Sequence, residues 1–174
     1  MYPVDDRDKV VELANVPQSS VGAPLPLVLS DELRVLLAYI VQEPTPDWDG
    51  TSVRIVGPNT PSEPLALVEF TFYSTYIFGA PNDEAFDGHP LAARGLRPYR
   101  AFQIENSSWI RQLERMNSVH PFHKSERFKQ LRHYVFAFHD STFECVARGY
   151  TISTHEGSLE SMLSIMRDRL QWEP

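Results

Sequence analysis

The sequence has one cysteine, few glycines and no long apolar run. A single cysteine cannot form an internal disulfide, which favours the reducing cytoplasm as the site of action. No apolar stretch reaches the roughly 18 residues that a membrane-spanning helix needs, so we expect no membrane partner. The first residues, MYPVDDRDKV, are too charged to form the apolar core of a signal peptide. We therefore expect a cytoplasmic protein.

Motifs for well-known chemistry are also missing. The sequence contains no glycine-rich dinucleotide fingerprint, no phosphate-binding P-loop, no CxxC pair, no HExxH and no GxSxG. The segment that begins at Asp83 starts like a calcium loop, but Ala85 and Arg94 stand at its third and twelfth positions, where calcium needs oxygen ligands. We expect no cofactor, and the residues leave open whether the protein is an enzyme.

The length and the charge of the chain limit the number of domains and the kinds of binding partner that we expect. The 174 residues are enough for one domain, in which residues 1–20 are a candidate extended arm. The net charge of −7 makes a nucleic acid an unlikely partner. Twelve of the 14 prolines precede residue 99, which favours strands joined by stiff loops in the first half.

Hydrophobic periodicity predicts an α+β fold with about seven mostly antiparallel strands and two or three helices. Alternating apolar residues predict strands at 25–30, 33–41, 52–57, 65–78 (with a bend near Ser74), 99–104, 132–139 and 142–150. Asn106, Ser107 and Ser108 are typical of a helix start, and Pro121 should end that helix. A second, amphipathic helix is predicted at the C-terminus from Leu159, Met162, Leu163, Met166 and Leu170.

The segments 132–139 and 142–150 are predicted to form a hairpin with its tip at Asp140-Ser141. In that register Phe138 faces Phe143, Phe136 faces Cys145, and Tyr134 faces Ala147. All these side chains then share one buried face, while His133, Ala137, His139 and Glu144 share a half-exposed face.

Four phrases in the sequence resemble a group of uncharacterised bacterial proteins of similar length. They are VPQSSVGAP at 16–24, GAPNDEAFDGHPLAARGL at 79–96, NSSWIRQLERMNSVHP at 106–121 and FHDSTFECVA at 138–147. The resemblance covers most of the chain and implies a single-domain bacterial protein. It carries over no activity and no functional residue.

Charge is distributed unevenly along the chain. Residues 94–132 contain nine Lys or Arg and three acids, whereas the rest contains seven bases and 20 acids. Such a basic segment is expected to bind an anionic ligand or an acidic partner, or else to neutralise the protein's own acidic part. The candidate ligand-binding residues are Arg94, Arg97, Arg111 and Arg115, together with Asn82, Asp83 and His89 of the neighbouring loop.

The loop Gly79–Gly95 is a second candidate site because it combines sharp turns with polar side chains. His89 is a candidate general base that Asp83, Glu84 or Asp87 would orient. No obvious nucleophile lies nearby, and the loop is equally well interpreted as a structured crossover.

Histidines suggest an alternative metal site. His120 and His123 have a spacing found in metal centres, and the predicted hairpin makes His139 and Glu144 diagonal neighbours. These four residues are the candidate metal ligands, and His89, Asp87, His139 and Glu144 are the catalytic candidates. The alternative function is thus a metal-dependent enzyme.

Our leading hypothesis is a cytoplasmic binding protein that engages an unknown protein partner or a small anionic ligand through residues 94–132 and the loop Gly79–Gly95. A homo-oligomer is compatible with this hypothesis, but nothing in the sequence selects an oligomeric state.

Overall fold

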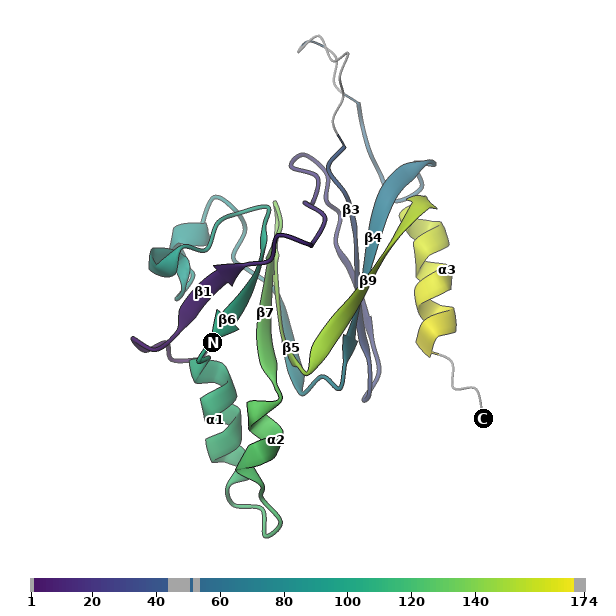
Figure 1. Cartoon of the computed structure of the whole chain (residues 1–174). Helices are drawn as coiled ribbons and strands as arrows, with labels where there is room; N and C mark the ends of the chain where they lie inside the picture. Colours follow the sequence, from purple (N-terminus) through teal and green to yellow (C-terminus); the bar gives the residue numbers. More distant parts are fainter. Residues whose placement is uncertain (1, 44–50, 52–53, 171–174) are drawn as a thin grey trace.

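The chain forms two antiparallel β-sheets packed face to face, with the C-terminal helix on the outer face of one sheet and two helices at one end (Figure 1). We describe residues 2–43, 51 and 54–170 of a computed structural model. Among these residues there are nine strands and three α-helices, which confirms the predicted α+β class and adds two strands to the expected seven.

The first sheet has five strands. Their order is β1 (Lys9–Glu12), β6 (Ala101–Glu105), β7 (Arg132–Ala137), β8 (Thr142–Ala147) and β5 (Thr75–Gly79). The second sheet has four strands, in the order β2 (Leu27–Ser30), β3 (Val35–Ile40), β4 (Glu63–Thr71) and β9 (Gly149–Gly157). Every pair of neighbouring strands is antiparallel.

A bent ribbon connects the two sheets. One arm of the ribbon is β4 followed by β5, and the other is β8 followed by β9. The first arm leaves one sheet and enters the other at residues 72–74, which confirms the predicted bend near Ser74. The second arm crosses at Arg148, so the predicted strand 142–150 divides there and β9 continues in the other sheet.

Aromatic side chains fill the space between the sheets. Tyr39 of β3 lies with its ring centroid 5.3 Å from that of Phe138, and Phe70 of β4 lies 5.4 Å from Phe143. Phe136 is 2% exposed in the same cluster. The face of the hairpin that was predicted to be buried is therefore the face that holds the two sheets together.

The register of the β7–β8 hairpin differs from the predicted one by two residues. Phe136 pairs with Phe143 and Tyr134 with Cys145, and the Phe138 amide donates to the Ser141 carbonyl at 2.8 Å. The tip is thus His139-Asp140 rather than Asp140-Ser141. A shift of two residues keeps every side chain on its predicted face because strand side chains alternate with a period of two.

The other face of this hairpin is not half-exposed as predicted. His133 is 0% exposed and Glu144 is 3% exposed. A second apolar cluster covers them, and it includes Tyr2, Phe86, Leu91, Trp109 and Val135. The candidate N-terminal arm is in fact packed, since Tyr2 lies in this cluster and β1 pairs with β6.

The helices agree with the sequence at their starts. α1 (Ser108–Asn117) begins after Ser107, whose side chain caps it, and α3 (Leu159–Leu170) buries Leu159, Met162 and Met166 on the outer face of the four-stranded sheet. The short α2 (Ser125–Lys129) was not predicted. A strand predicted at 52–57 is absent over residues 54–57, and residues 52–53 lie outside the described part.

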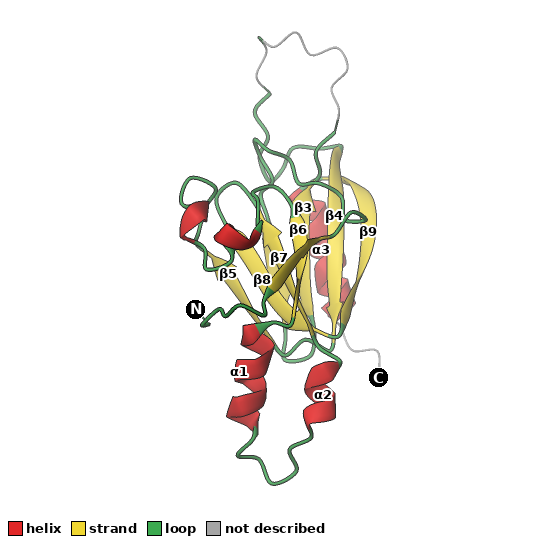
Figure 2. Cartoon of the chain, turned by 60° about the vertical axis from the view of Figure 1, so that its left-hand side comes forward, coloured by secondary structure: helices red, strands yellow, loops and turns green. Residues whose placement is uncertain are grey.

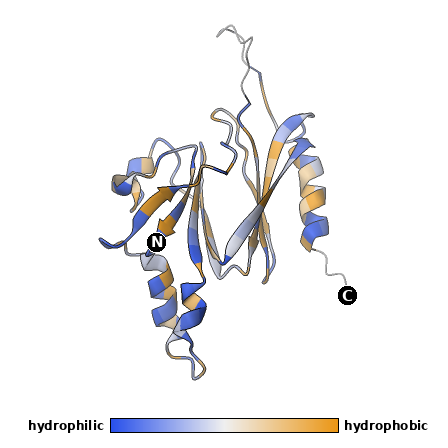
Figure 3. Cartoon of the chain, in the orientation of Figure 1, coloured by the Kyte–Doolittle hydropathy of each residue, from blue (hydrophilic) through white to orange (hydrophobic). Residues whose placement is uncertain are grey.

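α1 and α2 form a helical hairpin that projects from one end of the sheets (Figure 2). It leaves the first sheet after β6 and returns to it at β7. Both helices are mainly hydrophilic, unlike the strands of the core (Figure 3).

Replacing Phe136 by Ala should lower the free energy of unfolding by about 3–5 kcal/mol, because it opens a cavity between the sheets. The control variant His139→Ala should cost less than about 1 kcal/mol, because a partly exposed ion pair contributes little. Chemical denaturation of both variants checks this. A larger loss for His139→Ala would contradict the assignment of the buried face.

Candidate functional site

The Glu144 carboxylate is the centre of a buried polar network. The Tyr2 hydroxyl donates to its Oε2 at 2.5 Å, and Nε2 of His133 lies 3.0 Å from the same oxygen. Nε2 of His89 lies 3.3 Å from Oε1. Three distant parts of the chain, namely the N-terminus, the loop Gly79–Gly95 and β7, thus meet at one carboxylate of β8.

Hydrogen bonds also indicate which ring nitrogens carry protons. The Leu91 amide donates to Nδ1 of His89 at 3.1 Å, so the proton of a neutral His89 is on Nε2 and points at Glu144. Nδ1 of His133 lies 3.0 Å from the Ser107 hydroxyl, which accepts from the Ile110 amide. A carboxylate only accepts, so Nε2 of His133 donates to Glu144, and the Ser107 hydroxyl donates to Nδ1 when His133 is neutral.

Burial and hydrogen bonding act in opposite directions on the pKa of Glu144. Burial raises its pKa. The hydrogen bonds from His133 and His89, the charge of His133 and the Tyr2 hydrogen bond together lower it by more than that, and the resulting pKa is about 2. Burial and the adjacent Glu144 charge raise the pKa of Tyr2 well above its ordinary value. The carboxylate is ionised and the phenol stays protonated as its donor.

Ser107, His133 and Glu144 have the connectivity of a nucleophile, a base and an acid. Two observations favour a structural role instead. Ser107 is 3% exposed and its hydroxyl already caps α1. The Ser108 amide, at the helix N-terminus where an oxyanion would be stabilised, donates to Asp8 Oδ1 at 2.6 Å. Asp8 of the same chain thus occupies the place of an oxyanion. We therefore interpret the network as a structural one that holds the N-terminal segment on the sheet.

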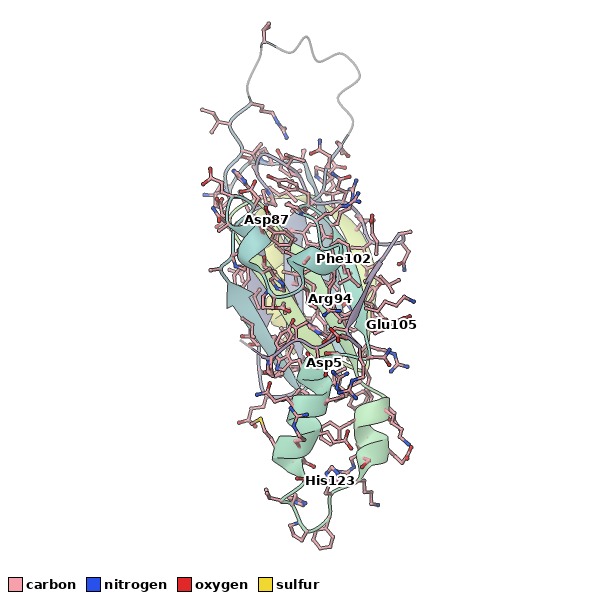
Figure 4. All side chains as sticks on the ribbon, turned by 90° about the vertical axis from the view of Figure 1, so that its left-hand side faces the viewer. Asp5, Asp87, Arg94, Phe102, Glu105 and His123 are labelled. Atoms are coloured by element: carbon pink, nitrogen blue, oxygen red, sulfur yellow. The ribbon has the colours of Figure 1, made fainter. Side chains whose placement is uncertain are left out.

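Acids of the N-terminal segment neutralise the inner part of the basic segment 94–132, by which we mean Arg94 and Arg111. Arg111 lies 2.6 Å from Asp5 and 3.9 Å from Asp8, and Arg94 lies 3.6 Å from Asp6. Figure 4 shows Asp5 and Arg94 midway along this face, between Asp87 and His123. Arg94 and Arg111, two predicted ligand-binding residues, are therefore already paired within the chain.

The outer part of the basic segment is different. Arg115, Lys124, Arg127 and Arg132 have no carboxylate within 4.0 Å among the described residues. Three large apolar side chains accompany these cations on the α1–α2 hairpin and are highly exposed, namely Met116 (65%), Val119 (88%) and Phe122 (75%).

A groove of about 700 Å³ lies where the hairpin joins the sheet. Ile104 of β6, Ile110 of α1 and Leu131 provide apolar lining. Lys129, which is paired with Glu126, and Arg132 add positive charge at the same groove, although Glu105 and Glu114 also line it. The Arg132 guanidinium donates to the carbonyls of Lys129 and Leu131 at 2.9 Å. Apolar lining with cations beside it suits an amphipathic anion.

Three polar side chains of the loop Gly79–Gly95, those of Asn82, Asp83 and His89, form hydrogen bonds within the fold. His89 is buried against Glu144, and none of its three predicted orienting acids, Asp83, Glu84 and Asp87, is the carboxylate that it contacts. The Asn82 side chain accepts from the Ala85 amide at 3.1 Å. The loop is the structured crossover that the sequence left open.

Asp83 joins this loop to the hairpin tip. Its Oδ2 lies 2.9 Å from Nδ1 of His139 and also accepts from the Tyr99 hydroxyl. Hydrogen bonds from Tyr99 and His139 lower the pKa of Asp83, and the bond to Asp83 raises that of His139. His139 therefore belongs to this pair and not to the Glu144 network.

The predicted metal ligands are not brought together. His120 and His123 lie on the projecting hairpin, where His123 contacts Asn117 at 3.0 Å and Glu114 at 3.9 Å. His139 lies at the β7–β8 turn beside Asp83, because the register differs by two residues from the predicted one. In the described part of the chain, no group of three His, Cys, Asp or Glu residues could hold a metal ion.

No model of a known family, no curated protein and no solved structure is significantly similar to this chain. The resemblance of the four phrases stays a prediction. None of the described helices is long and apolar enough to cross a membrane.

Sequence reasoning selected Glu144 and His89 but gave them the wrong neighbours, and it placed His133 on the same strand face as Glu144 without making it a candidate site residue. Tyr2 was not predicted as a site residue, because its contact with Glu144 spans 142 residues and no local sequence pattern indicates it. Ser107 was predicted only as a helix cap, and its bond to His133 depends on the packing of α1 against β7.

Replacing Glu144 by Gln should make the free energy of unfolding depend less on pH in the acidic range. The folded pKa of about 2 lies below the ordinary 4.5, so the carboxylate stabilises the fold fully above 4.5 and loses this effect as pH falls toward 2. The wild type should lose roughly 3 kcal/mol across that window that the variant does not lose. Denaturant titrations at several pH values measure the difference, and parallel curves would contradict it.

Replacing Asp83 by Asn should lower the pKa of His139 toward its ordinary value, since the carboxylate that stabilises the imidazolium is removed. An NMR titration of the histidine ring protons measures this. An unchanged His139 titration would show that the pair does not form in solution.

Proposed function

We propose that this is an interaction protein whose α1–α2 hairpin binds an acidic protein partner. One observation carries the proposal: three cations without a carboxylate partner among the described residues, Arg115, Lys124 and Arg127, share the projecting hairpin with three highly exposed apolar side chains. Isolated apolar residues on a surface are ordinary, but several of them beside uncompensated charge favour an interaction surface.

The α1–α2 hairpin is a better candidate than the rest of the basic segment. Arg94 and Arg111 are paired with Asp6 and Asp5, so an external anion would have to displace these acids. The loop Gly79–Gly95, our other candidate, commits Asn82, Asp83 and His89 to bonds within the fold. Arg97 also has no carboxylate within 4.0 Å among the described residues, but the exposed apolar side chains accompany Arg115 and the other cations of the hairpin.

An acidic protein segment suits this surface better than a nucleic acid. The net charge of −7 repels a polyanion at long range, whereas a partner with a few carboxylates and an apolar face can use the groove and the exposed side chains together. We place this interaction in the cytoplasm, on the basis of the single thiol, Cys145, which is buried.

Reversing the charge of Arg115 and Arg127 together to Glu should weaken binding of an acidic amphipathic peptide by about tenfold or more. The probe is a fluorescein-labelled synthetic helix with Glu on one face and Leu on the other, followed by anisotropy at low and high salt. Binding by the wild type should weaken as salt rises, because exposed charges are screened.

The matched control reverses two exposed arginines of α3, Arg167 and Arg169, and changes the net charge equally. It should change affinity by less than about twofold. An equal loss of affinity in both double variants would overturn the proposal, and so would a wild-type affinity that does not change with salt concentration.

A further inference from the structure

The edge strands of the two sheets differ in length. β9 spans nine residues at one edge of the four-stranded sheet. The other three edge strands are short, with four residues in β1, four in β2 and five in β5. A long edge strand presents a row of backbone donors and acceptors that can pair with another strand.

β9 also lacks the features that usually block such pairing. It pairs with β4 without a bulge over nine consecutive residues, from Gly149 opposite Thr71 to Gly157 opposite Glu63. Its sequence, GYTISTHEG, contains no proline and no lysine, and Glu156 is its one acid. Tyr, Thr and Ile favour strands, so this edge is regular and only weakly charged.

The pattern of β9 is compatible with pairing to itself. In an antiparallel pair centred on Ser153, Thr151 would face His155 and Tyr150 would face Glu156. Ile152 would face Thr154, and the terminal glycines would face each other. No two like charges are opposed in this register, and each pair shares one face of the sheet.

We propose that two copies of the chain associate through β9, around a two-fold axis at Ser153, to form one continuous eight-stranded sheet. A second copy is the occupant that these observations favour, because it supplies a strand of the same length, and a two-fold axis makes every contact twice. The main-chain bonds would provide the attraction, as in other cases of strand addition.

This interface is independent of the proposed function. The α1–α2 hairpin connects β6 and β7 of the five-stranded sheet, whereas β9 is an edge of the other sheet. A dimer of this kind would carry two hairpins and could bind two acidic segments at once.

The test measures the mass of the full chain by light scattering after size exclusion, over a dilution series. The wild type should run at about twice 19.9 kDa. The double variant Thr151→Lys, Thr154→Lys places four added charges across the interface at positions that are exposed in the single chain, and should run as a monomer. The control Asn59→Lys, Ala93→Lys adds the same charge at exposed positions elsewhere and should remain a dimer.

A cysteine at the axis gives a second measurement. In Ser153→Cys, the two thiols would lie opposite each other, and mild oxidation should give a disulfide-linked dimer on a non-reducing gel. Wild-type Cys145 is buried and should not cross-link. A wild type that is monomeric at every concentration, or a dimer that persists in the lysine double variant, would overturn the proposal. Either result would leave the peptide-binding test of the α1–α2 hairpin unaffected.

Discussion

The need to solvate one buried charge determines how the outer layer of the five-stranded sheet is built. Glu144 is 3% exposed, and an ionised carboxylate at that depth requires hydrogen-bond donors from the protein. Those donors are Tyr2, His133 and His89, which belong to the N-terminus, β7 and the loop Gly79–Gly95. The position of each segment therefore depends on the others, since an unpaired carboxylate here would be costly.

The same network explains why the N-terminal acids lie where they do. The Tyr2 ring stacks on Trp109 at 5.0 Å, so the chain that follows runs across the start of α1. Asp8 then accepts from the Ser108 amide, and Asp5 pairs with Arg111. Favourable charge at a helix N-terminus adds to this arrangement. The basic segment is thus divided into an inner part that the protein neutralises itself and an outer part on the α1–α2 hairpin.

The two-sheet core follows from a different constraint, which is local alternation. β3 is apolar on both faces because aromatic residues of the first sheet pack on one side and α3 on the other. The ribbon of β4–β5 and β8–β9 can cross from one sheet to the other because the chain breaks its alternation at 72–74 and at Arg148. These breaks also leave β9 as a long edge strand.

The sequence by itself determined the α+β class, most strands, the cap of α1 and the face of each residue in the β7–β8 hairpin. All of these depend on periodicity or on neighbours within a few residues, which a linear pattern records. It could not determine the hairpin register, because a shift of two residues keeps every face. Nor could it join Tyr2 to Glu144, or decide which arginines meet the N-terminal acids. Only the tertiary structure decided these, because the pairings link residues far apart along the chain, and close packing of the sheets, rather than any local preference, brings them together.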